Sequence, residues 1–109
     1  MGIYRMYTGE DGESHMEELQ PSDPIVETLS KVSGCALQVT EPSEFGELHP
    51  APRRRWMTVL SGQIDIQVSD GTIYSFGPED LRLWEDLTGK GHRTRFPVRT
   101  VQISMPIPD

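Results

Sequence analysis

Hydrophobic and polar residues alternate with a period of two along much of the chain after residue 34. The clearest case is QIDIQV at residues 63–68, in which Ile64, Ile66 and Val68 alternate with polar residues. Such alternation is typical of a β-strand with one buried face. Similar short stretches occur at residues 35–41, 55–60, 72–76, 81–85, 92–96 and 99–105. Many short strands at even spacing predict an all-β sandwich or barrel.

Turn sequences separate these predicted strands. Gly62 precedes residues 63–68 and Asp70-Gly71 follows them, and Asp-Gly is among the strongest short hairpin signals. The sequence FGPED at residues 76–80 predicts a further turn, and LTGKGH at residues 87–92 predicts a glycine-rich loop that leads into the next strand.

Only residues 24–32 have a helical pattern. Pro24 suits the first helical position after an N-cap at Ser22 or Asp23, and Gly34 suits the end. We therefore expect at most one short helix. The chain before it reads as a strand, a turn at Asp11-Gly12 and a short extension. The expected organisation is one domain over residues 1–109, with residues 1–34 as the N-terminal strand and extension and residues 35–109 as the barrel core.

Composition and charge exclude several classes of protein. The 109 residues suffice for one modest core, and the net charge of -7 argues against a general affinity for nucleic acid. No apolar run approaches the roughly 20 residues of a membrane span, and the N-terminus lacks the features of a signal peptide. Cys35 is the only cysteine, which excludes an intramolecular disulfide, and we expect it to be buried. We expect a cytoplasmic protein that binds neither membrane nor nucleic acid.

The segment RRRWMTVLSGQIDIQVSDGTIYSFGPEDLRLWEDLTGKGH, residues 53–92, resembles the small single-domain cupins. The stretches DGESH and EDLTGKGH further resemble a subgroup of short bacterial members. The resemblance implies a double-stranded β-helix, the cupin jelly-roll barrel, with a pocket inside it. If Gly62 closes the first cupin motif, His49 falls on its first histidine, Ala51 on its second and Arg55 on its glutamate. His92 stands for the histidine of the second motif, so two of the usual metal ligands are missing.

Strand alternation predicts which side chains enter the pocket. Met57 shares a strand face with Arg55, and Leu81 and Leu83 share a face with Glu85. We therefore expect Arg55 and Glu85 to point inward near the barrel mouth, beside His49 and His92. A buried arginine and carboxylate are costly unless they are paired or bind a ligand, which makes this group a candidate site. Trp56 and Trp84 are expected on the opposite faces, in sheet packing or a dimer interface.

The first functional hypothesis is a pocket that binds a small anionic organic ligand without metal. Arg55 would hold a carboxylate or phosphate through two hydrogen bonds, with Met57 in the lining and Arg53 adding a contact at the rim. Glu85 and His92 would transfer protons as catalytic residues, as in an isomerase, cyclase or lyase. Arg54 is expected to face away and to be dispensable.

Two alternatives stay open at the level of sequence. One is a dioxygenase, isomerase or lyase that uses Fe, Mn, Ni or Zn, bound by His49 and His92 with Glu85 or His15 completing the ligand set. Arg55 would repel such a cation, so any metal is expected to be weakly held. The other alternative is a ligand-binding module without catalysis.

The strands at the two ends of the chain, residues 3–9 and 99–108, are expected at sheet edges. Exposed edges are normally covered or paired with another chain. Small cupins also tend to dimerise, by resemblance. We therefore expect a homodimer.

Overall fold

The computed structural model describes residues 2–108, which form nine β-strands and one 3-10 helix. The elements are β1 (Ile3–Thr8), β2 (Ser14–Leu19), η1 (Pro24–Lys31), β3 (Ala36–Thr40), β4 (Arg55–Ser61), β5 (Ile64–Val68), β6 (Ile73–Phe76), β7 (Leu81–Glu85), β8 (His92–Arg95) and β9 (Thr100–Pro106). All seven strands predicted after residue 34 are present.

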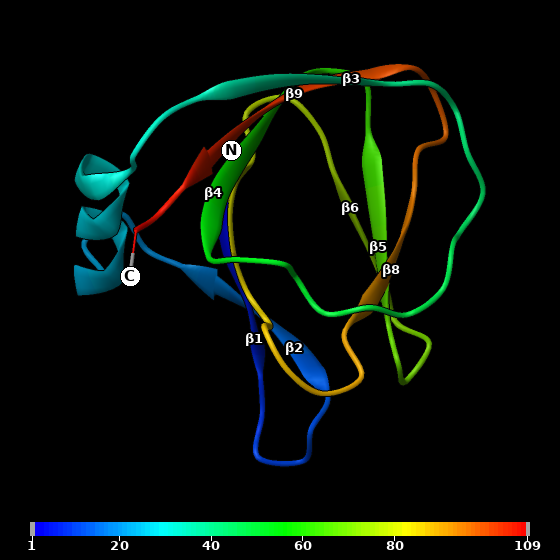
Figure 1. The fold of residues 1–109 in the computed structure, drawn as a ribbon, viewed down its shortest axis with the longest axis horizontal. Helices are drawn as coiled ribbons and strands as arrows, with labels where there is room; N and C mark the ends of the chain where they lie inside the picture. The colour runs from blue at the N-terminus through cyan, green and yellow to red at the C-terminus, as the bar shows by residue number, and fades with distance from the viewer. Residues whose placement is uncertain (1, 109) are drawn as a thin grey trace.

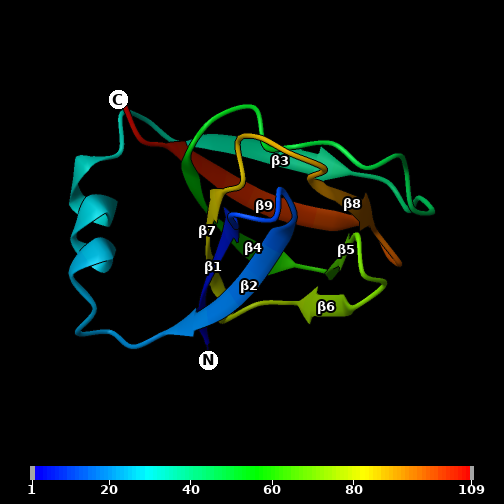
Figure 2. The same ribbon diagram turned by 90° about the horizontal axis from the view of Figure 1, so that it is seen from below.

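The strands form two sheets that enclose an interior (Figures 1 and 2). The larger sheet has the order β2-β1-β7-β4-β9-β3, and the smaller has the order β6-β5-β8. Neighbouring strands are antiparallel except β1 and β7, which run parallel. The all-β fold class predicted from the sequence is confirmed, and the arrangement is consistent with a jelly-roll barrel.

The predicted hairpin between β5 and β6 is also present. Ile64 lies opposite Phe76, and the Gly71 amide donates to the Val68 carbonyl across the turn. Gly71 has a φ of 95°, a conformation that glycine adopts without steric cost. The Asp-Gly signal therefore determined this turn locally.

The N-terminal segment is more regular than expected. Residues 14–19, expected to be a short extension, form β2, which pairs with β1 in the larger sheet. The predicted helix is a 3-10 helix that covers the outer face of this sheet (Figure 1). Cys35, expected to be buried, is exposed just before β3. Within residues 2–108, no helix is long and apolar enough to cross a membrane.

Both faces of the larger sheet carry an apolar core. The inner core lies between the sheets and consists of Met6, Ala51, Met57, Val59, Ile64, Ile66, Val68, Phe76 and Trp84. The outer core is centred on Trp56 and Leu83, and Ile25, Val26, Leu29 and Val32 of the η1 segment pack against it. Burial of these two sets of side chains holds the sheets together and holds η1 on the sheet.

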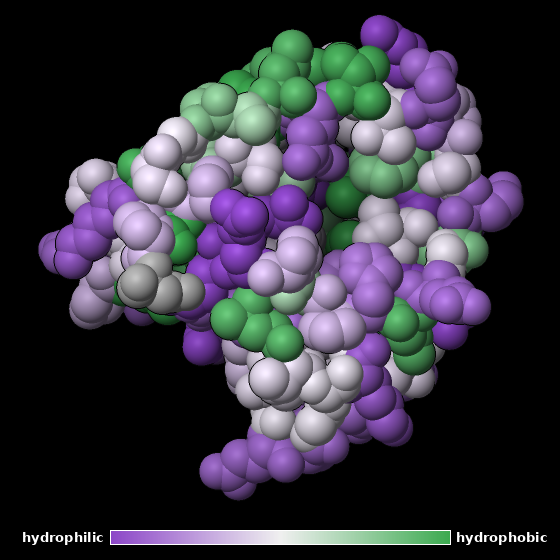
Figure 3. Space-filling model, in the orientation of Figure 1, coloured by the Kyte–Doolittle hydropathy of each residue, from purple (hydrophilic) through white to green (hydrophobic). Residues whose placement is uncertain are grey.

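Apolar residues are also exposed along one sheet edge. Leu37 and Val39, which are 65% and 49% exposed, lie on the edge strand β3. Figure 3 shows apolar surface at the top of the molecule, where β3 lies in Figure 1.

Candidate functional site

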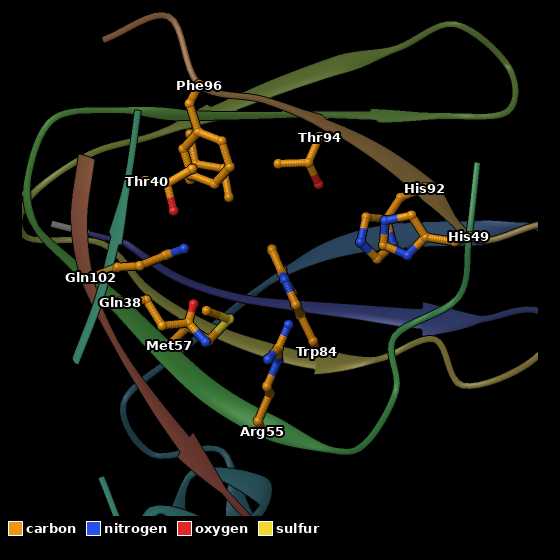
Figure 4. Close-up of a pocket in the computed structure, with 11 residues that line it drawn as sticks. Gln38, Thr40, His49, Arg55, Met57, Trp84, His92, Thr94, Phe96 and Gln102 are labelled. Atoms are coloured by element: carbon orange, nitrogen blue, oxygen red, sulfur yellow. The ribbon is translucent and has the colours of Figure 1, made fainter. Parts of the chain in front are cut away.

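A cavity of about 270 Å³ lies between the two sheets (Figure 4). This is slightly below the range of about 300–1,000 Å³ that is usual for small-molecule sites. Its lining is mixed polar and apolar and consists of Gln38, Thr40, His49, Arg55, Met57, Ile64, Trp84, His92, Thr94, Phe96 and Gln102. The structure thus brings Arg55, Met57, His49 and His92 to one cavity, as the strand pattern and the motif positions predicted.

Arg55 is the half-buried cation of this cavity. Its Nε atom is buried without a hydrogen-bond partner, and within residues 2–108 its guanidinium has no ion pair. Burial lowers the pKa of Arg55, and the nearby charge of Arg53 lowers it further, while Asp86 acts in the opposite direction. The group is therefore a cation at the cavity wall whose charge no carboxylate neutralises by direct contact.

His92 is held in place by a carboxylate that the sequence did not single out. Its Nδ1 lies 2.6 Å from Oδ2 of Asp86, which also accepts a hydrogen bond of 2.7 Å from the Ser14 hydroxyl. His92 and Asp86 are 3% and 0% exposed. An ionised carboxylate only accepts hydrogen bonds, so Nδ1 of His92 donates and Nε2 is left as the basic nitrogen.

His49 lies next to His92 in an exposed position. The two ring centroids are 5.0 Å apart, and the two backbones form an isolated antiparallel bridge. Gly91, with a φ of 74°, lets the glycine-rich loop approach the His49 backbone so closely that a Cβ atom there would overlap the His49 carbonyl. The loop sequence therefore explains why these two histidines are neighbours.

Behind the cavity wall lies Arg82, a second arginine of the barrel interior. Its side chain is fully buried, and its Nη2 donates a hydrogen bond of 2.6 Å to Oε1 of Gln102. Its guanidinium carbon lies 5.1 Å from the ring centroid of Trp84 and 5.8 Å from that of Phe76. Within residues 2–108, Nε and Nη1 of Arg82 are without a hydrogen-bond partner.

The expectation that Glu85 points into the barrel is wrong. Arg55 and Trp84 lie directly opposite each other on β4 and β7, so their side chains share the inner face. Glu85 therefore points outward, where it forms ion pairs of 2.5 Å with Arg5 and 2.6 Å with Arg54. The same register places Trp84 in the cavity, contrary to the outward position expected for it, whereas Trp56 lies in the outer core as expected.

Three other residues lie outside the cavity lining. Arg53 is exposed in the loop before β4, because that strand begins only at Arg55. Arg54 faces away, as expected, and forms an ion pair with Glu85. That it is dispensable for ligand binding stays a prediction. His15 is exposed on β2 and bonded to Asp11, away from His49 and His92.

The residues of the cavity do not fit a metal site of the three-ligand kind. No group of three or more His, Cys, Asp or Glu side chains with the geometry to hold a metal ion occurs within residues 2–108. His49 and His92 are the two imidazoles of the lining, and Nδ1 of His92 is already bonded to Asp86. Arg55 adds a positive charge to the same cavity, which opposes binding of a cation.

Sequence reasoning missed Asp86, Arg82 and Gln102. The signal for Asp86 and Arg82 was the inner-face register of β7, which alternation alone assigned to the wrong face. Gln102 is a polar residue between Val101 and Ile103, a pattern that is equally typical of a residue facing solvent and of a polar residue facing the interior. Only strand pairing identifies these three residues as interior.

Comparison with known proteins supports the fold and no more. No family model matches this chain, and no curated protein matches it. Among solved structures, the protein NMB1881 from Neisseria meningitidis is similar, with a TM-score of 0.51 and 11% sequence identity over 68% of this chain and 75% of that one. At this identity the similarity shows the architecture alone, so this chain has a compact all-β fold shared with that structure.

Proposed function

We propose that this chain is a small cupin whose barrel cavity binds a small anionic organic ligand through Arg55. The observation that carries the proposal is a half-buried guanidinium on the cavity wall, without an ion pair among the described residues. A buried charge without a partner is costly, and a bidentate carboxylate is the partner that matches a guanidinium best. The cupin assignment rests on the resemblance of residues 53–92 and on the jelly-roll arrangement.

We propose His92, supported by Asp86, as the acid-base group of this site. Asp86, and not Glu85, is the carboxylate that acts together with His92. It accepts a hydrogen bond from Nδ1 of His92, which leaves Nε2 of His92 for a ligand. His49, with its ring 5.0 Å away, supplies a second imidazole on the same side of the cavity. An anion held by Arg55 next to such a pair suits a proton-transfer reaction, such as that of an isomerase or lyase.

Binding of butyrate, a small monocarboxylate, tests the proposal. We expect calorimetric titration at constant ionic strength to detect binding to the natural protein and to find none with Arg55→Met. Arg99→Met is the matched control, because it removes the same charge from an exposed ion pair with Glu41 outside the cavity. Equal binding by the Arg55→Met protein would overturn the assignment of Arg55.

Three further measurements separate the alternative functions. Native mass spectrometry of protein purified from its own host identifies the bound ligand, and turnover of that ligand distinguishes an enzyme from a binding module. One equivalent of metal retained after dialysis against a chelator, and released in His49→Ala with His92→Ala, would favour the metal-dependent alternative.

A further inference from the structure

Arg82 is a buried cation that the fold does not neutralise. It is 0% exposed, and the described residues provide no carboxylate in contact with it. Of its nitrogens, Nη2 donates to Gln102, while Nε and Nη1 are unpartnered. Burial lowers its pKa to about 9, and the positive charge of Arg55 contributes to that shift, while the charge of Asp80 acts in the opposite direction.

Packing alone does not account for this arrangement. The rings of Trp84 and Phe76 lie near the guanidinium and offset part of the cost of burying it. An apolar residue of similar volume at position 82 would avoid that cost altogether, since apolar replacements of buried charges are often neutral or stabilising. We therefore expect Arg82 to lower the stability of the ligand-free barrel, as is common for groups that serve a site.

Gln102 links Arg82 to the cavity. Its Oε1 accepts from Arg82, so its Nε2, which can only donate, is left for the cavity that Gln102 lines. Figure 4 shows the nitrogen end of Gln102 directed into the open space. A glutamate here would pair with Arg82 and cancel its charge, whereas the neutral amide leaves that charge available to a ligand.

Arg55 and Gln102 reach the cavity from separated points of its wall. Gln102 on β9 lies opposite Val59, which is four residues from Arg55 along β4. At about 3.3 Å per residue the two backbone positions lie roughly 13 Å apart along the strand, and the two side chains close part of this distance because both line the same cavity. The cavity therefore has two groups that attract an anion, at two places, with the Arg82 charge behind the second.

We propose that the ligand is a dicarboxylate, with one carboxylate held by Arg55 and the other by the Nε2 amide of Gln102. Arg82 is a positioning residue: it orients the Gln102 amide as a donor and supplies a positive charge behind it. This inference rests on the proposed function, since it assumes the Arg55 anion site. It adds the class of ligand and a second recognition point.

The test compares succinate with butyrate, which has the same carbon chain and one carboxylate fewer. We expect calorimetry at constant ionic strength to show about tenfold tighter binding of succinate by the natural protein. Arg82→Met should bring succinate binding close to that of butyrate while leaving butyrate binding within about twofold. Its melting temperature should be equal to or above that of the natural protein, which a structural role of Arg82 would not produce.

Gln102→Glu provides a second variant that does not depend on the folding of Arg82→Met. The new carboxylate would pair with Arg82, so we expect a higher melting temperature together with loss of the preference for succinate. A preference for succinate that survives in both variants, while Arg55→Met binds neither ligand, would overturn the assignment of the second carboxylate to Gln102 and Arg82 and leave the proposed function standing. Succinate binding no tighter than butyrate binding by the natural protein would overturn the dicarboxylate inference in the same way. Butyrate and succinate binding that is indifferent to Arg55→Met would overturn the proposed function, and absence of binding of both by the natural protein would overturn both proposals.

Discussion

Buried charged residues of this chain fall into two groups that differ in how completely they are paired. Asp65 is 2% exposed and accepts hydrogen bonds from Gln63, Ser75 and Arg95, so its carboxylate is fully used. Among the described residues, Arg55 and Arg82 have buried nitrogens without partners and belong to the cavity or its wall, and Oδ1 of Asp86 and Nε of Arg93 are also buried without partners. A buried charged side chain whose polar atoms all have hydrogen-bond partners, such as Asp65, has a structural role. One that faces the cavity with polar atoms left over indicates that a ligand supplies the missing partner.

Asp65→Asn should lower the free energy of unfolding by about 2 kcal/mol at pH 7, because a charge-assisted pair with Arg95 is lost. Burial opposes ionisation of Asp65, but its hydrogen bonds to Gln63, Arg95 and Ser75 prevail and hold its pKa below the usual value. A depressed folded pKa stabilises the protein above the unfolded pKa of about 3.9, and this stabilisation is lost as the pH falls through the folded pKa. Urea unfolding from pH 7 to pH 3 should therefore show the difference between the two proteins shrinking below about pH 4.

Glu41→Gln is the control for Asp65→Asn. Glu41 also pairs with an arginine, Arg99, but both side chains are exposed, so we expect a change below about 0.5 kcal/mol. A pH-independent effect of Asp65→Asn would contradict the assignment of its stabilisation to the ionised carboxylate.

The contact between Asp86 and His92 can be measured by a double-mutant cycle. We expect Asp86→Ala and His92→Ala to be coupled by about 1.5–3 kcal/mol in urea unfolding, because their buried bond of 2.6 Å involves a carboxylate. The control cycle pairs Asp86→Ala with His49→Ala, which has no hydrogen bond to Asp86, and should give coupling below about 0.5 kcal/mol. Equal coupling in both cycles would show that Asp86 does not act on His92 specifically.

At the scale of elements, β7 explains the main error of the sequence analysis. Alternation correctly separated the residues of β7 into two sets that point to opposite faces. It could not tell which face is interior, because both faces of the larger sheet are buried, one under the smaller sheet and one under η1. The apolar set was therefore assigned to the barrel interior although it belongs under the helix. The interior set is Arg82, Trp84 and Asp86, and the outer set is Leu81, Leu83 and Glu85.

Trp56 on β4 joins the outer core to η1. It is 0% exposed, and its indole Nε1 donates a hydrogen bond of 2.9 Å to the Thr28 hydroxyl. We expect Trp56→Ala to lower the free energy of unfolding by about 3–5 kcal/mol, measured in urea. Thr28→Val removes only the hydroxyl and should cost about 1 kcal/mol. Similar losses in the two variants would mean that the indole contributes little packing.

The loop before β8 depends on Gly91. Gly91→Ala would overlap the His49 carbonyl, whereas Gly71→Ala meets open space, although both glycines have positive φ. Both variants should therefore share a backbone cost of about 1–2 kcal/mol, and Gly91→Ala should lose about 1–3 kcal/mol more from overpacking. Thermal unfolding measures the difference in stability between the two variants. Equal losses of stability would show that the His49 backbone can move away from the new Cβ atom at little cost.

At the scale of the whole molecule, the expected homodimer stays a prediction, but its expected interface changes. β1 and β9 lie inside the larger sheet, so the edges are β2 and β3 rather than the terminal strands named from the sequence. The exposed Leu37 and Val39 make β3 the surface on which we now expect a second copy.

Light scattering at micromolar concentration should give about twice the chain mass of 12.3 kDa. Leu37→Lys should shift the mass to that of a single chain, because it places a charge in the apolar surface of β3. Ile73→Lys, a similarly exposed apolar position on β6 of the other sheet, should leave the dimer unchanged. A single-chain mass for the natural protein would refute the prediction.

The sequence by itself determined the seven strands after residue 34, the hairpin and the helical segment, because turn residues and period-two alternation act over a few neighbouring residues. It did not predict β2, which forms through pairing with β1. It also brought Arg55, Met57, His49 and His92 to one cavity, through motif positions inside short strands and loops. Tertiary structure alone decided which face of β7 is interior, since both faces are buried and only pairing with β4 fixes the register. It likewise decided that Asp86 supports His92, six residues further along the chain, and that Gln102 meets Arg82, 20 residues away. Neither contact follows from strand alternation or turn residues.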